Sequence, residues 1–272
     1  MRFRTICLLA TLSIASVSTV SYAQRMVVAG NKLLVNGQPV WLNAANTPWN
    51  AWNDFGGSYN HAWWDAEFAE MKSYGANGMR TWITCNGDAP ISIDENGFVT
   101  GLSAKFWTDL DDYFALAEKH RIYVMATLIS FDHTITNNKN SDRFRKMYNS
   151  DAAIDAFVNN YVIPFVNRYK SNPYLCIIEP CNEIEWVNQN ADRGGIAWDR
   201  LQTFVGKVAA AVHKNSEVLV TLGCNIKWQS SRPSEDGNRF ADALLQQRVS
   251  GAGVYLDVYS PHWYEWALPW HG

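Results

Sequence analysis

The chain has 272 residues, with 23 Lys and Arg side chains against 26 Asp and Glu, a formal charge of −3. A slightly acidic balance disfavours nucleic acid and anionic membrane as partners. The length suits one large domain better than two small ones, because α/β barrels routinely use about 250 residues for a single unit.

The first 23 residues have the pattern of a secretory signal. Arg2 and Arg4 precede an apolar run over residues 6–15, and Ser21-Tyr22-Ala23 is a small-x-Ala cleavage pattern. We therefore expect a signal peptide at 1–23, a mature domain at 24–272 near charge −5, and a secreted or periplasmic location. No stretch is long and apolar enough to predict a membrane span. The oligomeric state is not predicted.

Short apolar runs alternate with longer segments of helical period along the mature chain, a pattern typical of βαβ units and a parallel sheet. Residues 32–39, with Asn36-Gly37 at the centre, predict a hairpin that covers the start of the domain. Six strands are predicted next: 40–45, 78–83, 122–129, 174–179, 218–223 and 256–260.

Helices are predicted between these strands from their apolar spacing. One carries Trp64, Phe68 and Met71 on one face and ends at Gly75. Another begins with Asp151 as its N-cap and is expected to bend at Pro164. A third has apolar residues at helical spacing: Leu201, Phe204, Val205, Val208 and Val212. The sequence thus predicts a TIM (β/α)8 barrel, with about six of its eight units in this chain.

The strongest chemical signal is Asn182-Glu183, which follows the fourth predicted strand. Barrel enzymes place catalytic groups at the C-terminal ends of strands. A glycosidase needs one carboxyl with a raised pKa to protonate the leaving oxygen, and a neighbouring amide can bind the sugar 2-hydroxyl. An isolated Asn-Glu pair is ordinarily a surface turn, but its position after a buried strand favours the catalytic interpretation.

Three motifs in chain order resemble glycoside hydrolase family 5, the cellulase and β-mannanase family. The segment 75–80 is similar to the second-strand signature that ends in an arginine, here Arg80. Asn182-Glu183 is similar to the fourth-strand acid/base pair, and His262-Trp263-Tyr264 to the sixth-strand His-x-Tyr element. The resemblance spans nearly all mature residues and implies a retaining hydrolase of β-1,4-linked polysaccharide.

The resemblance also implies roles for the neighbouring side chains. Arg80 would hold a nucleophilic carboxylate in its ionised form, and Tyr264 would donate a hydrogen bond to the same carboxylate. His262 would bind sugar hydroxyls or adjust the acid/base residue, although a core histidine remains an alternative. His133, after the third strand, would line the cleft, with the same alternative. Trp82 would be a sugar-stacking platform.

The family's nucleophile, a glutamate after the seventh strand, has no counterpart in this chain. Glu179, Glu185 and Glu265 do not match its motif. A retaining mechanism needs two carboxyls about 5–5.5 Å apart. We therefore expect the chain to be C-terminally incomplete, with its nucleophile beyond residue 272, and to be inactive or unfolded at the open barrel edge.

Aromatic residues are unusually frequent, at 13 Trp, 12 Tyr and 12 Phe, and many follow predicted strands. Their places predict sugar-stacking surfaces on the catalytic face. That set is Trp49, Trp52, Trp82, Trp186, Trp228, Trp263, Trp266 and Trp270.

Four cysteines remain after the signal. A Cys181–Cys224 disulfide is one possibility and unpaired buried thiols are the other. Asp132-His133 has no third metal ligand at a suitable spacing, so neither a metal nor a cofactor is predicted.

The leading hypothesis is a retaining hydrolase with Glu183 as acid/base, acting on mannan slightly in preference to cellulose. The sequence does not distinguish endo from exo action. The alternatives are a non-catalytic glycan-binding barrel or an inactive gene fragment. An unrelated phosphate-handling barrel is weaker, because no glycine-rich phosphate loop is present.

Overall fold

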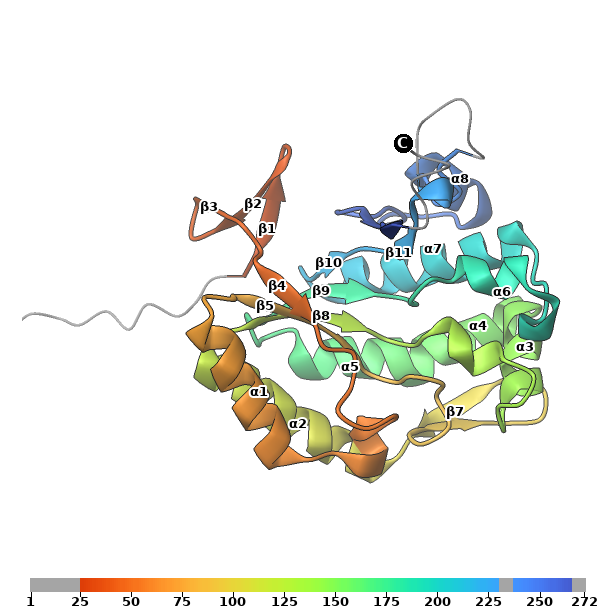
Figure 1. Ribbon diagram of the computed structural model, residues 1–272. Coiled ribbons are helices and arrows are strands. Elements are labelled where there is room, and N and C mark those ends of the chain that lie inside the picture. The colour runs from red at the N-terminus through yellow and green to blue at the C-terminus, as the bar shows by residue number, and fades with distance from the viewer. Residues whose placement is uncertain (1–24, 230–236, 266–272) are drawn as a thin grey trace, which may run out of the picture.

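The computed structural model describes residues 25–229 and 237–265, and Figure 1 shows their arrangement. The predicted signal segment, 1–23, lies outside the described residues, as do Trp266 and Trp270. No helix in the described ranges is long and apolar enough to cross a membrane.

A parallel sheet forms the centre of the fold. Its strands are hydrogen-bonded in the order β10-β9-β8-β5-β4, so each strand pairs with the next strand of this sheet along the chain. The bounds are β4 (Ala44–Asn46), β5 (Gly78–Trp82), β8 (Tyr123–Thr127), β9 (Leu175–Glu179) and β10 (Leu219–Val220). A second parallel pair, β11 (Gly223–Asn225) and β12 (Ser260–His262), continues the series. Consecutive parallel strands with helical crossovers are the architecture of an α/β barrel.

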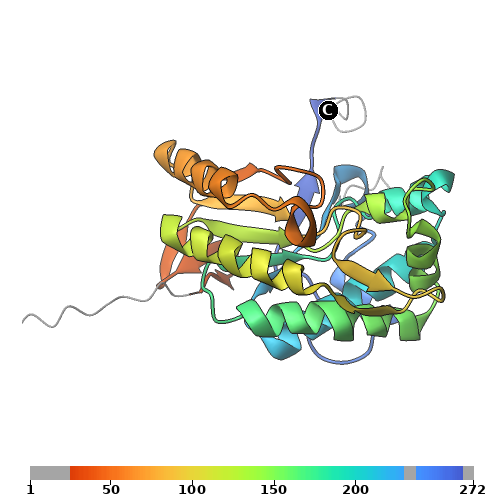
Figure 2. The same ribbon diagram turned by 90° about the horizontal axis from the view of Figure 1, so that it is seen from below.

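Helices pack on one side of this sheet, and Figure 2 shows α1, α2 and α5 in front of the strands. The longer helices are α1 (His61–Ser73), α2 (Ala104–His120) and α7 (Trp198–Asn215). The shorter helices are α3 (Ser141–Tyr148), α4 (Asp151–Phe157), α5 (Ile163–Tyr169), α6 (Glu185–Gln189) and α8 (Asp242–Arg248).

The predicted faces of these helices are buried as expected. Trp64, Phe68 and Met71 of α1 are buried, and so is the apolar stripe of α7. Burial of one such side chain contributes about 1.5–3 kcal/mol. The helices therefore hold the sheet rigid and fix where its strands end.

Two small antiparallel units complete the fold. The predicted hairpin is present as β2 (Lys32–Val35) and β3 (Gln38–Val40), with β1 (Val27–Ala29) as a third strand. Leu33, Val35 and Val40 of this unit pack against a small cluster of buried residues at the start of the sheet. The second unit, β6 (Ile91–Ile93) and β7 (Val99–Leu102), is not among the strands predicted from the sequence.

Three predicted strands differ from the structure by more than one or two residues. The first strand begins at Ala44 and not at residue 40, because the backbone of Asn43 is hydrogen-bonded to Asn77 before the ladder starts. The predicted strand 218–223 is two short strands, β10 and β11, paired with β9 and β12 respectively. The last strand begins at Ser260, four residues later than predicted, because the Asp257 and Val258 N–H groups donate to the Val220 carbonyl.

The predicted helix around residues 151–165 also differs in detail. Ser150 is the N-cap, and its hydroxyl accepts a hydrogen bond from the Ala153 N–H at 3.2 Å, so Asp151 is the first helical residue. Pro164 lies in the first turn of α5, directly after a π-helical turn over Val158–Val162. A π-turn accommodates the missing proline N–H, since it shifts the hydrogen-bond pattern before the ring.

Candidate active site

The predicted site residues meet at the C-terminal ends of the parallel strands. A cleft of about 530 Å³ is lined by Arg80 and Trp82 of β5, Asn182 and Glu183 after β9, and residues 260–264 of β12 and its extension. The motifs and the family resemblance assign site roles to Arg80, Asn182, Glu183, His262 and Tyr264. The structure brings all five together there.

Three donors surround the Glu183 carboxyl. His262 Nδ1 lies 2.8 Å from Oε1, the Tyr264 hydroxyl donates to Oε1 at 3.2 Å, and the Trp186 indole N–H donates to Oε2 at 3.1 Å. Burial alone would raise the pKa of Glu183, but His262 and the other donors favour the ionised form and the net shift is downward. Both carboxyl oxygens are thus held in place from three sides.

The backbone at Glu183 is in the left-handed region, with φ of 45°. Such a conformation is unfavourable for a residue with a long side chain and persists only where the surroundings fix it. One fixing contact is the hydrogen bond from the Glu183 N–H to the Gly223 carbonyl at 2.9 Å. The turn aims the Glu183 side chain into the cleft instead of along the strand.

Arg80 lies beside Asn182 and Glu179. Its guanidinium donates to Glu179 Oε2 at 2.9 Å through Nε, to Asn182 Oδ1 at 2.8 Å and to Asn46 Oδ1 at 3.0 Å. The family resemblance implies that Arg80 holds a nucleophile in its ionised form. Among the described residues, its carboxylate partner is Glu179.

Glu179 is fully buried beneath the cleft. Besides Arg80, it accepts hydrogen bonds from the Gly223 N–H at 2.7 Å and from the Thr127 hydroxyl. Gly223 itself must lack a side chain, since a Cβ there would lie 2.3 Å from Glu179 Oε1 and 2.4 Å from His262 Nε2. Glu179 therefore joins β5, β8, β9 and β11 at the base of the site.

His133 does not reach the cleft, so its predicted place in the substrate site is wrong. The ring is fully buried, packs against Phe144 and Tyr148, and makes one hydrogen bond through Nδ1 to the Ser130 carbonyl. Burial lowers the pKa of His133 to about 4. The turn that ends the third strand rotates the ring into the core, which is the alternative that the sequence analysis had left open.

The predicted aromatic surface is present in part. Trp82 lines the cleft and contacts Trp49 and Trp52, with ring centroids 4.9 Å and 6.2 Å away. Trp52 is 40% exposed, so it offers a face to a ligand. Trp228 is buried against Trp198, and its ring is unavailable as a platform.

Several functional neighbours escaped the sequence analysis. Asn46, Phe131 and Ser130 had no motif, although Asn46 is the last residue of β4, Phe131 follows β8, and both line the cleft. Trp186 was noted only as an aromatic after the fourth strand, and its bond to Glu183 depends on the turn between them. Gly223 ends the fifth predicted strand, where a glycine signals a close approach of other groups.

The four described cysteines of the mature chain, Cys85, Cys176, Cys181 and Cys224, are buried and unpaired. This agrees with the second of the two possibilities left open by the sequence. The described residues also contain no group of three or more His, Cys, Asp or Glu side chains placed to hold a metal ion.

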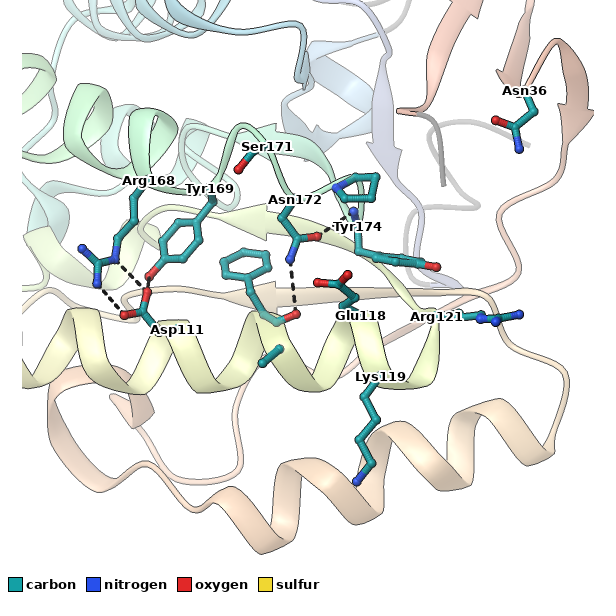
Figure 3. A pocket seen from close by; sticks show the side chains of 13 residues that line it. Asn36, Asp111, Glu118, Lys119, Arg121, Arg168, Tyr169, Ser171, Asn172 and Tyr174 are labelled. Atoms are coloured by element: carbon teal, nitrogen blue, oxygen red, sulfur yellow. Dashed lines mark hydrogen bonds and ion pairs between the residues drawn. The ribbon is translucent and has the colours of Figure 1, made fainter. Parts of the chain in front are cut away.

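A larger concave surface lies at the opposite end of the strands, between α2 and the segment that precedes β9 (Figure 3). Part of its charged lining is internally paired, since Arg168 and Tyr169 both bind the Asp111 carboxylate. Barrel enzymes carry their chemistry at the other end of the strands. The cleft around Glu183 is therefore the candidate active site.

Known proteins place this geometry in context. No protein-family model matches the chain. A mannan endo-1,4-β-mannosidase of Cryptopygus antarcticus is 25% identical, and the match covers 89% of this chain and 69% of the relative. A second, from Mytilus edulis, is 24% identical over 95% of this chain and 76% of the relative. The chain is a homologue of mannanase-type glycoside hydrolases. This confirms the family resemblance inferred from the motifs.

Solved structures agree on the fold of this mannanase homologue. The endo-1,4-β-mannanase of Eisenia fetida superposes with a TM-score of 0.78 at 24% identity, covering 89% of this chain and 73% of that one. The β-mannanase of Mytilus edulis gives 0.78 at 22% identity, covering 90% and 76%. These neighbours are TIM barrels, which confirms the predicted fold class for a chain whose described strands do not close the barrel.

Proposed function

We propose that the protein hydrolyses β-1,4-linked mannan with retention of configuration, as a member of glycoside hydrolase family 5, with Glu183 as its acid/base residue. The observation that carries the proposal is the Glu183 carboxyl itself. It lies in an aromatic-lined cleft at the C-terminal ends of the strands, between His262 and Trp186. The naming of two homologues as mannan endo-1,4-β-mannosidases supports the substrate and endo action.

Glu183 would act twice in this reaction. In the first step its proton passes to the glycosidic oxygen as the C–O bond breaks and a nucleophilic carboxylate bonds to the anomeric carbon. In the second step the Glu183 carboxylate takes a proton from water while the water oxygen displaces the nucleophile. Glu183 ends protonated, ready for the next cycle.

The first step needs Glu183 in its protonated form, whereas its pKa in the described cleft is below the usual value. A second carboxylate nearby would raise this pKa by charge repulsion, as would displacement of water by a sugar. Glu183 is the only carboxyl among the described residues that line the cleft. We propose that the nucleophile is a second carboxylate outside the described residues.

The side chains around Glu183 would bind the sugar. Asn182 is held by Arg80 through its oxygen and donates to the Ser130 hydroxyl at 3.3 Å, so its amide is fixed beside the carboxyl. That place suits a hydrogen bond to the sugar 2-hydroxyl. Trp82 would stack on the apolar face of a sugar ring. His262 would hold Glu183 and contact the same ring.

Secretion is part of the same proposal. Residues 1–23 have the charged, apolar and small-residue regions of a signal peptide, and Gln24 would begin the mature protein. An intact polysaccharide does not diffuse across a lipid bilayer, so an exported enzyme would meet this substrate outside the cell. N-terminal sequencing of the exported protein would test this point.

The test of the proposed function is Glu183→Gln in the protein, assayed on β-mannan and carboxymethylcellulose. General acid catalysis contributes about 10²–10⁴-fold, so turnover of mannan should fall by that factor. An aryl mannoside with a good leaving group needs no protonation in the first step. The rate of that step in Glu183→Gln should therefore fall much less with the aryl mannoside than with mannan. Glu118→Gln, an exposed carboxyl at the far end of the barrel, is the matched control. Undiminished mannan turnover by Glu183→Gln would refute the assignment.

The reaction product tests the retaining mechanism and separates hydrolysis from glycan binding without cleavage. NMR of the first-formed sugar should show the β-anomer, as retention requires. A wild-type protein that binds mannan oligosaccharides without cleaving them would instead be a non-catalytic glycan-binding barrel.

A further inference from the structure

Glu185 is a buried carboxyl to which the reaction scheme gives no role. It is the first residue of α6, two positions after Glu183, and its side chain is fully buried. Its Oε1 accepts a hydrogen bond from the Asn225 N–H at 2.7 Å, while its Oε2 has no partner among the described residues. Burial of a carboxyl is unfavourable unless its contacts compensate, so this one needs an explanation.

The hydrogen bond from Asn225 connects two parts of the candidate site. Asn225 lies in β11, opposite His262 in the parallel pair with β12. His262 in turn contacts Glu183 Oε1 at 2.8 Å. Glu183 and Glu185, two residues apart on one segment, thus contact His262 and Asn225, which lie opposite each other in the paired strands β12 and β11.

The contacts with β11 support the strained turn at Glu183. The left-handed backbone there, with φ of 45°, needs contacts on both sides to persist. The Glu183 N–H donates to the Gly223 carbonyl at 2.9 Å. Two residues further along each of these two segments, the Asn225 N–H donates to the Glu185 carboxyl. Both contacts are made with β11, so the turn is held against one strand at two points.

We infer that Glu185 is a positioning residue whose carboxyl fixes the Glu183 turn against β11 and so keeps Glu183 in contact with His262. The inference rests on the proposed function only for what Glu183 does to a substrate. The positioning itself is a property of the folded protein and can be measured without turnover.

The ionisable groups that face Glu185 are Glu183 on its own segment, Cys224 on β11, Cys181 before the turn and Tyr264 after β12. Burial raises the pKa of Glu185 to about 7, so this carboxyl is neutral in the range where Glu183 titrates. A glutamine at this position therefore reproduces both its charge and its reach.

Two conservative variants separate reach from charge. Glu185→Gln keeps an acceptor oxygen at the same distance from Asn225, whereas Glu185→Asp keeps the carboxyl but withdraws it by one methylene. The pKa of Glu183 is read from its side-chain carboxyl carbon by NMR titration. Because the His262 contact favours ionised Glu183, we expect Glu185→Asp to raise that pKa by about one unit and Glu185→Gln to leave it unchanged.

Asp109→Ala is the matched control. Asp109 is also a buried carboxyl that accepts a backbone N–H, from Gly56 at 2.8 Å, but it does not line the cleft. This variant should lower the melting temperature without moving the pKa of Glu183. A purely structural role for Glu185 would make Glu185→Asp behave in the same way.

Kinetics gives a second measurement in the active enzyme. Misplacement of a catalytic group by about 1 Å can reduce the rate up to about 10²-fold. Glu185→Asp should therefore lower kcat with little change in KM, whereas Glu185→Gln should keep the kcat of the wild-type protein. An unmoved Glu183 pKa in Glu185→Asp, or an equal shift in Glu185→Gln, would overturn the inference. A wild-type protein that cleaves no glycan would refute the proposed function and leave the NMR comparison valid.

Discussion

The pair of Arg80 and Glu179 provides a sharp test of how the base of the site is held. Glu179 is fully buried, and Arg80 Nη2 lies 2.7 Å from its Oε2. Arg80→Met leaves this carboxylate without its cation, which costs about 3–5 kcal/mol of folding free energy for a buried pair. At about 2–4 °C per kcal/mol for a protein of this size, the melting temperature should fall by about 6–20 °C.

The double variant decides whether charge is the reason. Glu179→Gln on the Arg80→Met background removes the unpaired charge and keeps an acceptor for the Gly223 N–H, so most of the lost stability should return. Urea denaturation followed by tryptophan fluorescence measures all three variants. The exposed pair Arg168–Asp111 is the control, and its loss should cost about 0–1 kcal/mol. If the double variant is no more stable than Arg80→Met, the reasoning is wrong.

Three further predictions follow from the same geometry. Gly223→Ala would place a Cβ 2.4 Å from His262 Nε2, so it should cost about 1–3 kcal/mol in urea denaturation; an unchanged midpoint would contradict the close packing. His133, with its pKa lowered to about 4, binds fewer protons folded than unfolded between pH 6.5 and 4. The free energy of unfolding should therefore fall by about 3 kcal/mol as the pH is lowered from 6.5 to 4, and this fall should be absent in His133→Phe. Equal pH dependence of the unfolding free energy in both proteins would contradict the buried, neutral His133. Trp186→Phe removes one donor from Glu183 Oε2 and should raise the pKa of Glu183 by about one unit in an NMR titration, where no shift would show that the indole does not stabilise the carboxylate.

Local pattern was sufficient for the elements of the fold. The faces of α1 and α7 follow from apolar spacing, and β5, β8 and β9 lie within one or two residues of their predicted ends. The helical period and the short apolar runs of strands are properties of a few neighbouring residues, so they are visible in the sequence without any tertiary contact. The short strands were less certain, because their limits depend on which partner receives each N–H.

The candidate site also has a part that the sequence predicted and a part that it did not. Sequence alone placed Glu183 after the fourth strand and Arg80 on the second, because parallel strands present their C-terminal ends together. The side chains that bind Arg80 and Glu183 could not be derived from this rule, because they lie far away in the sequence. Arg80 is 102 residues from Asn182, and His262 is 79 residues from Glu183.

The remaining features were decided by tertiary structure. His133 is rotated into the core by the turn after β8, the four buried cysteines stay unpaired, and Glu185 reaches β11 from the first turn of α6. Each depends on the direction of a side chain at the end of a strand. A sequence pattern determines which residues reach that end of the barrel, but the backbone turn there determines whether each side chain enters the cleft, the core or a neighbouring strand.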